Sequence, residues 1–449
     1  MYVPHTEAER EKMLSTIGLK SMQDLFQDVP ATERFPDLRL DPALTEMEAM
    51  AELQDLAAAD ETTSELVCFL GAGAYNHYVP SAVDAMISRG EFYTAYTPYQ
   101  PEISQGTLQA IFEYQSLIAA LTGMDVSNAS HYDGATAAAE AVSLANAHFR
   151  GKRSKIILSP ALNPQYRQTI RTYNPGTELT FIGDNSGIDL TADPDALIPL
   201  IDKDTALVLV QYPDFFGRVY DLSKLAEAAH AAGALLAVSA NPMALGILKP
   251  PGEFDVDIVT GEGQPLGIPL SFGGPYLGFF ATKKNYLRKI AGRLVGETVD
   301  DRGQRAYVLT LTAREQHIRR ERATSNICTN QGLIALATTV YMSLLGKNGF
   351  REVANLNYQK AHYAAKQLSE LEGFELWSEE PFFNEFTLRC PKPVAELNES
   401  LLEYGIVGGY DLGLDYPQCS DHMLLAVTEM NSKDDIDLLV EALAEVSHD

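Results

Sequence analysis

The middle of the chain alternates strand-length apolar segments with a helix-forming segment, and no other feature constrains the fold as strongly. The pattern consists of apolar runs at residues 155–158, 207–210 and 235–238 and of a helical run at residues 222–232. Gly233 ends the helical run, and Asp221 or Ser223 can cap its start. Two strands joined by a helix of this length pair in parallel, and helices then cover the faces of the sheet. The sequence therefore predicts an α/β domain with a mostly parallel sheet.

Two regions of different character flank this domain in the 449-residue chain. Residues 1–66 contain short acidic and amphipathic helical patterns that are separated by prolines. Residues 348–449 begin with a charged helical stretch, continue with shorter strands and end in a helix that starts near Ser432. We therefore predict an N-terminal helical arm at residues 1–66, a large α/β domain at residues 67–347 and a small C-terminal α+β domain at residues 348–449.

The charge balance argues against one class of partner. The chain has 34 Lys and Arg residues against 61 Asp and Glu residues, which gives a formal net charge of −27. A protein that binds the phosphate backbone of a nucleic acid needs clustered cations, so we expect no nucleic-acid partner. The acidic surface is instead predicted to keep the protein soluble.

Three sequence features bear on where the protein works and on whether it binds a metal. Residues 324–346 carry no charge over about the width of a membrane, but polar side chains interrupt them and leucines recur at helical spacing, which predicts a buried helix and no membrane span. The first twelve residues lack the apolar core of a secretion signal. The four cysteines show no spacing typical of a metal site, so no metal is expected. We therefore expect a cytoplasmic protein.

Three segments of the large domain resemble the aminotransferase-like pattern of pyridoxal-phosphate (PLP) enzymes. Residues 133–141 place small residues at the start of a helix, whose free N–H groups and dipole favour a phosphate, although simple packing also explains small residues there. Residues 211–241 combine a proline, a glycine, a helix ending in Ala-His-Ala-Ala-Gly and a strand. Residues 255–280 lie where that pattern has a strand, the Schiff-base lysine and a glycine-rich turn. The resemblance implies the type I fold of PLP enzymes for the large domain.

Two groups that this cofactor requires are nevertheless missing. PLP needs an amine to form its internal aldimine and an acid partner for its pyridine nitrogen. Ser239 stands at the strand end where the pattern has an aspartate, and no lysine occurs between Lys249 and Lys283. We therefore predict an inherited fold without a working cofactor site. The degenerate pocket that remains is expected to comprise His131, Asp133, Gly134, Thr136, Ser239 and Asn241.

Two further motifs resemble signatures of the P-protein family of the glycine cleavage system. They are YTAYTPYQPEISQG at residues 93–106 and RATSNICTNQ at residues 322–331, and a weaker match spans residues 69–80. The resemblance covers nearly the whole chain. Members of this family are one long chain or two shorter chains, and the length of this chain matches the first of the two. In that subunit the cofactor lysine is absent, because the second subunit carries it.

The resemblance also implies a reaction and a set of partners. The two-subunit enzyme, a glycine dehydrogenase (decarboxylating), decarboxylates glycine and transfers the aminomethyl group to the lipoyl arm of the H-protein. PLP is then expected on the second subunit, with none bound covalently to this chain, in a heterotetramer with two copies of each subunit. This chain would complete and stabilise its partner's active site and be inactive alone. We expect side chains at the subunit interface from Tyr96, Thr97, Pro98, Tyr99, Gln100, Arg322, Thr324, Ser325 and Asn326.

Other interpretations of the same residues stay open. Tyr96 and Tyr99 also suit a buried aromatic loop, and Ser325 or Asn326 also suits a helix N-cap. A self-sufficient PLP enzyme with a displaced lysine is one alternative, and a non-catalytic scaffold or regulatory paralogue is another. A dinucleotide-binding oxidoreductase is the third alternative, but its glycine fingerprint is incomplete because Asn76 replaces the last glycine.

Overall fold

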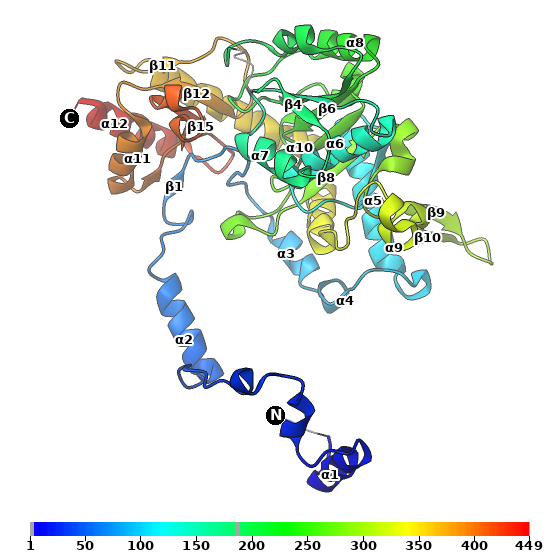
Figure 1. Cartoon of the computed structure of the whole chain (residues 1–449). Coiled ribbons are helices and arrows are strands. Elements are labelled where there is room, and N and C mark those ends of the chain that lie inside the picture. Colours follow the sequence, from blue (N-terminus) through cyan, green and yellow to red (C-terminus); the bar gives the residue numbers. More distant parts are fainter. Residues whose placement is uncertain (1–3, 185–188, 449) are drawn as a thin grey trace. The chain divides into compact units, whose positions relative to one another are not determined.

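The computed structural model describes residues 4–184 and 189–448, and the chain divides into two compact units, Met1–Glu61 and Thr62–Asp449 (Figure 1). The first unit contains helices α1 (Glu7–Thr16) and α2 (Glu46–Ala57). Each helix begins with a capping box, in which a threonine and the glutamate three residues later bond each other's backbone N–H groups. The boundary between the two units lies after residue 61, five residues before the predicted end of the arm. The division between a large and a small domain at residue 347 stays a prediction.

The second unit is built on a seven-stranded sheet with the strand order β2-β8-β7-β6-β5-β3-β4. Its strands are β2 (Val126–Ser127), β3 (Lys155–Leu158), β4 (Thr180–Ile182), β5 (Thr205–Tyr212), β6 (Leu235–Ala240), β7 (Ile258–Glu262) and β8 (Gly278–Thr282). The strands from β4 across to β7 pair in parallel, whereas β8 pairs antiparallel with both β7 and β2. The predicted α/β fold with a mostly parallel sheet is confirmed.

The predicted strand–helix–strand unit consists of β5, α8 (Ser223–Ala231) and β6. The backbone turns at Gly233, whose φ of +69° suits a residue without a Cβ atom. The prediction of a side-chain N-cap from Ser223 is wrong, because Leu222 occupies the N-cap position. Asp221 does bond the start of the helix as predicted, although it is not the N-cap residue: its carboxylate accepts the N–H of Ser223 at 2.8 Å.

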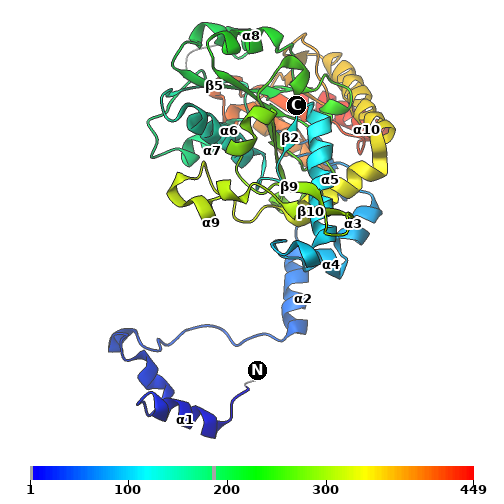
Figure 2. The ribbon, with the colours of Figure 1, turned by 90° about the vertical axis from the view of Figure 1, so that its right-hand side faces the viewer.

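Helices cover both faces of the large sheet, so side chains on both faces of its central strands are buried. Leu207 and Leu209 of β5 pack with α6 (Gly134–Phe149) and α7 (Pro164–Tyr173). Val208 and Val210 point to the opposite face, since side chains alternate along a strand. There they pack with α5 (Gln105–Thr122), α8 and α10 (Gly332–Ser369). Figure 2 shows α6 and α7 on one side of the sheet and α5 and α10 on the other.

A second, smaller core lies around a four-stranded antiparallel sheet in the order β11-β12-β15-β14. Its elements are β11 (Glu375–Leu376), β12 (Glu385–Arg389), β14 (Tyr410–Asp411) and β15 (His422–Ala426), with helices α11 (Val394–Glu403) and α12 (Lys433–His448). Phe386 and Leu388 of β12 alternate into this core beside Met423 and Leu425 of β15. The predicted final helix is thus confirmed within one residue of Ser432.

Other short strands and helices lie outside these two larger sheets. They are β1 (Val67–Cys68), which pairs in parallel with β13 (Ile406–Val407), the antiparallel hairpin of β9 (Val295–Val299) and β10 (Arg305–Leu309), and helices α3 (Ser81–Ile87), α4 (Gly90–Tyr93) and α9 (Gln316–Arg319). The predicted buried helix at residues 324–346 begins only at Gly332. Among the helices that the structure describes, none is long and apolar enough to cross a membrane.

Candidate functional site

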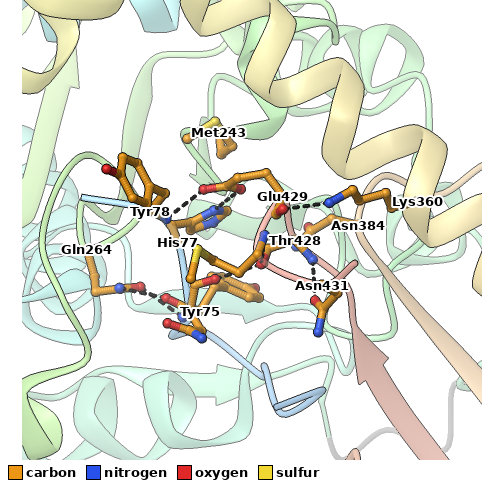
Figure 3. Close-up of polar contacts among 12 residues, drawn as sticks. Tyr75, His77, Tyr78, Met243, Gln264, Lys360, Asn384, Thr428, Glu429 and Asn431 are labelled. Atoms are coloured by element: carbon orange, nitrogen blue, oxygen red, sulfur yellow. Dashed lines mark hydrogen bonds and ion pairs between the residues drawn. The ribbon is translucent and has the colours of Figure 1, made fainter. Parts of the chain in front are cut away.

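A segment between β1 and α3, residues 71–78, lies against the carboxyl ends of the central strands, and we call it the strap (Figure 3). The backbone of Tyr75 bonds the side chain of Gln264 twice, at 2.9 Å through its N–H and at 2.8 Å through its carbonyl oxygen. The hydroxyl of Tyr75 donates to Glu385 at 2.6 Å, and the N–H of Ala72 donates to the same carboxylate at 2.7 Å. The strap is therefore tied both to the loop after β7 and to β12.

Glu429 holds the second half of the strap. Its carboxylate is 2.8 Å from Nδ1 of His77 and accepts the N–H of Tyr78 at 2.7 Å (Figure 3). The hydroxyl of Thr428 donates to the carbonyl oxygen of Asn76 at 2.6 Å. Burial alone would raise the pKa of Glu429, but the bond and charge of His77 and the N–H of Tyr78 hold this pKa below its ordinary value. The strap is thus fixed along its length.

A cavity of only about 30 Å³ lies under the strap, where β5, β6 and β7 end. Ser239, Asn241 and Glu262 are among the residues that line it. Open α/β sheets bind their ligands at this edge, beyond the carboxyl ends of the strands. A volume of this size holds one or two water molecules, whereas ligand sites have volumes of about 300 Å³ or more. The cavity has the position of a ligand site without the room for a ligand.

The other residues of the predicted degenerate pocket lie around the start of α6. The carboxylate of Asp133 caps this helix by accepting the N–H of Thr136 at 2.8 Å, and Gly134 is the first helical residue. His131 is fully buried, with its ring centroid 5.0 Å from that of Phe280, and burial lowers its pKa to about 3. The structure thus places Ser239 and Asn241 at the cavity, while Asp133 and Thr136 serve the helix cap.

The residues of this chain do not fit PLP. Lys283 is engaged in ion pairs with Asp255 at 2.7 Å and Asp257 at 3.0 Å, and the ammonium nitrogen of Lys249 lies 4.1 Å from the ring centroid of Phe254. Neither lysine lines the 30 Å³ cavity. The pocket therefore lacks an amine, space, and an acid at the position of Ser239. Among the described residues no cluster of three or more His, Cys, Asp or Glu could hold a metal ion.

A larger cavity, of about 250 Å³, lies beside the first signature segment. Its lining includes Tyr96, Thr97 and Pro98 from that segment. The side chain of Tyr96 is 82% exposed and that of Tyr99 is 59% exposed, so their interpretation as a buried aromatic loop is wrong for this chain. Gln100 is also exposed. The first signature segment is thus largely a surface feature.

Arg293 connects the two signature segments, and no pattern in the sequence indicates this role. This buried guanidinium donates to the side chain of Asn330 at 2.9 Å and to the carbonyl oxygen of Cys328 at 2.6 Å. It also lies 3.4 Å from the hydroxyl of Tyr99. Arg293 and Asn330 line the 250 Å³ cavity. Asn330 belongs to the second signature and could have been selected on that ground, whereas Arg293 is an isolated residue in an ordinary segment.

The remaining predicted interface residues lie elsewhere. Thr324, Ser325 and Asn326 line a separate cavity of about 10 Å³. The hydroxyl of Ser325 donates to the buried carboxyl group of Glu140. Arg322 is exposed and lies 3.7 Å from Glu321. The interpretation of Ser325 or Asn326 as a helix N-cap is wrong, because α10 starts at Gly332 after an N-cap at residue 331.

The sheet order, the helices on both faces and the pocket at the strand ends define the type I fold of PLP enzymes. Solved structures with this fold include a sphingosine-1-phosphate lyase of Burkholderia pseudomallei, with a TM-score of 0.65 over 94% of both chains. A glutamate decarboxylase of Lactobacillus brevis has a TM-score of 0.64 over 94% of this chain and 98% of that chain. At 15% and 17% sequence identity these similarities show the fold alone.

The chain belongs to the glycine cleavage system P-protein family, whose profile matches residues 1–443. A probable glycine dehydrogenase (decarboxylating) subunit 1 of Anoxybacillus flavithermus is 53% identical over 447 residues, 99% of this chain and 98% of the relative. The protein of the same description from Thermomicrobium roseum is 52% identical over all of both chains. A crystal structure of glycine decarboxylase (P-protein), in inhibitor-bound form, has a TM-score of 0.89 and 44% identity over 99% of this chain and 100% of that chain.

Proposed function

We propose that this chain is the lysine-less subunit of a two-subunit glycine decarboxylase and that it works only with a second, PLP-carrying subunit. The observation that carries this proposal is the similarity to relatives described as subunit 1 over 99% of this chain. The absence of a lysine between Lys249 and Lys283 and the 30 Å³ cavity support a cofactor on the other subunit. Both observations come from this chain itself.

In this proposal the complex decarboxylates glycine and transfers the aminomethyl group to the lipoyl arm of an H-protein. The complex is a heterotetramer with two copies of each subunit and works in the cytoplasm. This chain completes the active site of the PLP-carrying subunit without contributing a catalytic residue of its own. Its membership of the P-protein family supports this reaction.

The surface around the 250 Å³ cavity is proposed to face the second subunit. Tyr93, Tyr96 and Tyr99 are exposed there on one short segment. Exposed aromatic clusters are uncommon on monomeric proteins, and tyrosine and arginine are enriched in protein interfaces. Thr97, Pro98 and Gln100 belong to the same segment, and we assign Arg322, Thr324, Ser325 and Asn326 to the neighbouring part of that interface.

The test is the exchange of the glycine carboxyl group with labelled bicarbonate in the presence of PLP and H-protein. It compares this chain alone, the second subunit alone and the mixture. We expect exchange only in the mixture. Exchange by this chain alone would contradict the proposal and favour a self-sufficient enzyme. A mixture that stays inactive, with a folded and cofactor-loaded second subunit, would favour a non-catalytic scaffold or regulatory paralogue.

A further inference from the structure

The N-terminus of α6 is filled by a side chain of this chain. Glu262 ends β7, and its buried carboxylate accepts three backbone N–H groups, from Gly134 at 2.8 Å, Leu277 at 2.9 Å and Gln264 at 3.0 Å. Gly134 is the first residue of α6, so its N–H has no partner within the helix. The free N–H groups at a helix start favour an anion, and here Glu262 supplies it.

The start of α6 packs closely against the end of β7, beside this carboxylate. A Cβ atom on Gly134 would lie 2.3 Å from the hydroxyl of Tyr166 and 2.8 Å from the backbone nitrogen of Glu262. The start of α6, the end of β7 and the side chain of Tyr166 are therefore in direct contact. Glycine at position 134 permits this close approach, because any side chain there would separate these elements.

A second carboxylate strengthens the exclusion of an external anion. Asp133 caps the same helix through the N–H of Thr136 at 2.8 Å, so two acidic side chains share one helix start. Burial raises the pKa of Glu262 to about 7, while the N–H groups of Leu277 and Gly134 act in the opposite direction. All three groups that bond Glu262 are donors, which is the arrangement that the ionised carboxylate requires.

We propose that Glu262 is a built-in anion that takes the place of a cofactor phosphate at the start of α6 and keeps the pocket of this chain closed. The missing lysine and the missing acid at Ser239 remove the chemistry of PLP, but neither would by itself prevent the phosphate group from binding. Glu262 does so directly. Gln264 extends the closure, because its N–H bonds Glu262 while its side chain holds the strap at Tyr75.

The proposal is tested by ligand binding to the isolated full-length chain at pH 8, above the pKa of about 7 to which burial raises the Glu262 carboxyl group. The probes are inorganic phosphate and pyridoxine 5′-phosphate, which lacks the aldehyde and so does not react with surface lysines. We expect no binding to the wild type in isothermal titration calorimetry. Glu262→Ala frees the N–H groups of Gly134, Leu277 and Gln264, so we expect it to bind both probes at least about tenfold more tightly than the detection limit that bounds the wild type. The double variant with Asp133→Asn should bind them more tightly still.

Glu385→Ala is the matched control. Its carboxyl group is also buried, and burial also raises its pKa to about 7, but it bonds the strap and not the start of α6. We expect this variant to gain no phosphate binding. A gain equal to that of Glu262→Ala would overturn the proposal, because it would show that loosening the pocket anywhere is sufficient.

The remaining outcomes are also decisive. Wild-type chain that binds the probes as tightly as the Glu262→Ala variant overturns the proposal, and so does a folded variant that gains nothing. If the alanine variant unfolds in phosphate-free buffer, Glu262→Ser replaces it, and near-ultraviolet circular dichroism follows refolding by added phosphate. Refolding supports the proposal, and its absence in both variants contradicts it. The second subunit is not present in these measurements, so their failure is distinct from a failure of the proposed decarboxylase function.

Discussion

Three buried glutamates, Glu140, Glu262 and Glu385, bond residues of the candidate site, and burial raises the pKa of each to about 7. Their partners differ in kind. Glu140 has the hydroxyl of Ser325 and a smaller effect of the hydroxyl of Ser143, and its buried Oε2 has no hydrogen-bond partner. Glu262 has three backbone N–H groups, and Glu385 has one hydroxyl and one N–H. Since an ionised carboxylate needs donors to offset the loss of water, Glu140 is the least well compensated.

Glu140 should therefore make the chain less stable as the pH rises. Its pKa is about 7 in the folded chain against an ordinary 4.5, so the folded state retains the proton longer than the unfolded state. The free energy of unfolding then falls as the pH rises from about 4.5 through about 7, by up to about 3 kcal/mol. Glu140→Gln cannot titrate, and we expect a flatter decline between pH 5 and pH 8. Urea denaturation at four pH values measures both profiles, and parallel profiles would contradict the assignment.

The hydroxyl of Tyr75 provides the second test at this scale. It donates to the buried carboxylate of Glu385 at 2.6 Å, so Tyr75→Phe leaves one oxygen of that carboxylate without this donor. We expect the free energy of unfolding to fall by about 1–3 kcal/mol. Tyr78→Phe is the control in the same strap, because the Tyr78 side chain is 60% exposed and its loss of a hydroxyl should change stability little. Equal effects of the two changes in chemical denaturation would contradict the role given to Tyr75.

Single residues also mark the limit of prediction from the sequence. The helix start at residues 133–141 was predicted from its small residues, and the structure has α6 there. The absence of a lysine between Lys249 and Lys283 can be read directly from the sequence. Glu262 lies inside that interval, but nothing in its spacing indicates a bond to Gly134, which lies 128 positions earlier. Such a contact depends on how β7 and α6 are placed in space, and only the structure gives that.

Among the elements, α10 differs most from its prediction. The uncharged stretch at residues 324–346 predicts one buried helix, but its first eight residues form a loop. Side chains in this loop bond other parts of the fold: Ser325 donates to Glu140, and Asn330 donates to the carbonyl oxygen of Ala129 at 2.9 Å. These tertiary bonds outweigh local helix propensity, which is a weak preference.

Gly346 gives a sharp test of the bend within α10. It has φ +57° and ψ −175°, a backbone conformation that essentially only glycine adopts. A Cβ atom there would meet nothing within 4 Å, so the cost of Gly346→Ala is purely conformational, about 1–3 kcal/mol. Gly349→Ala is the matched control, since its Cβ would make an ordinary 3.4 Å contact with Leu345 in a regular helix. We expect the control to be neutral or stabilising by up to about 1 kcal/mol, as measured by thermal unfolding. Equal losses from both changes would contradict this account of the bend.

The strands show why some elements were predictable and others were not. β3, β5 and β6 are buried on both faces and therefore read as apolar runs in the sequence. β2, β1 and β13 are only two residues long, so they carry no pattern. The parallel pairing of Val67 with Ile406 joins distant parts of the chain through this pair of short strands. Local sequence cannot specify such a pairing, because its partner is set by the packing of the small core around Phe69.

In the second unit as a whole, the two candidate sites contrast with each other. The cofactor-type pocket at the ends of β5, β6 and β7 has about 30 Å³ and is closed by Glu262 and the strap, whereas the cavity beside the first signature has about 250 Å³. A subunit that binds no cofactor but supports catalysis in a partner needs an interface and does not need an open pocket of its own. The small pocket and the larger cavity beside the first signature fit these two requirements.

The final prediction concerns the interface. Tyr96 is 82% exposed in this chain, so Tyr96→Ala should change the free energy of unfolding of the isolated chain by no more than about 0.5 kcal/mol. If Tyr96 packs against the second subunit, the same change should weaken association at least about tenfold, because buried tyrosines are frequent hot spots. Tyr173→Ala is the control, since Tyr173 is 43% exposed on α7 and does not line the 250 Å³ cavity. Sedimentation velocity of mixtures with the second subunit measures both dissociation constants. An unchanged dissociation constant for Tyr96→Ala would contradict the role given to Tyr96 as an anchor of this interface.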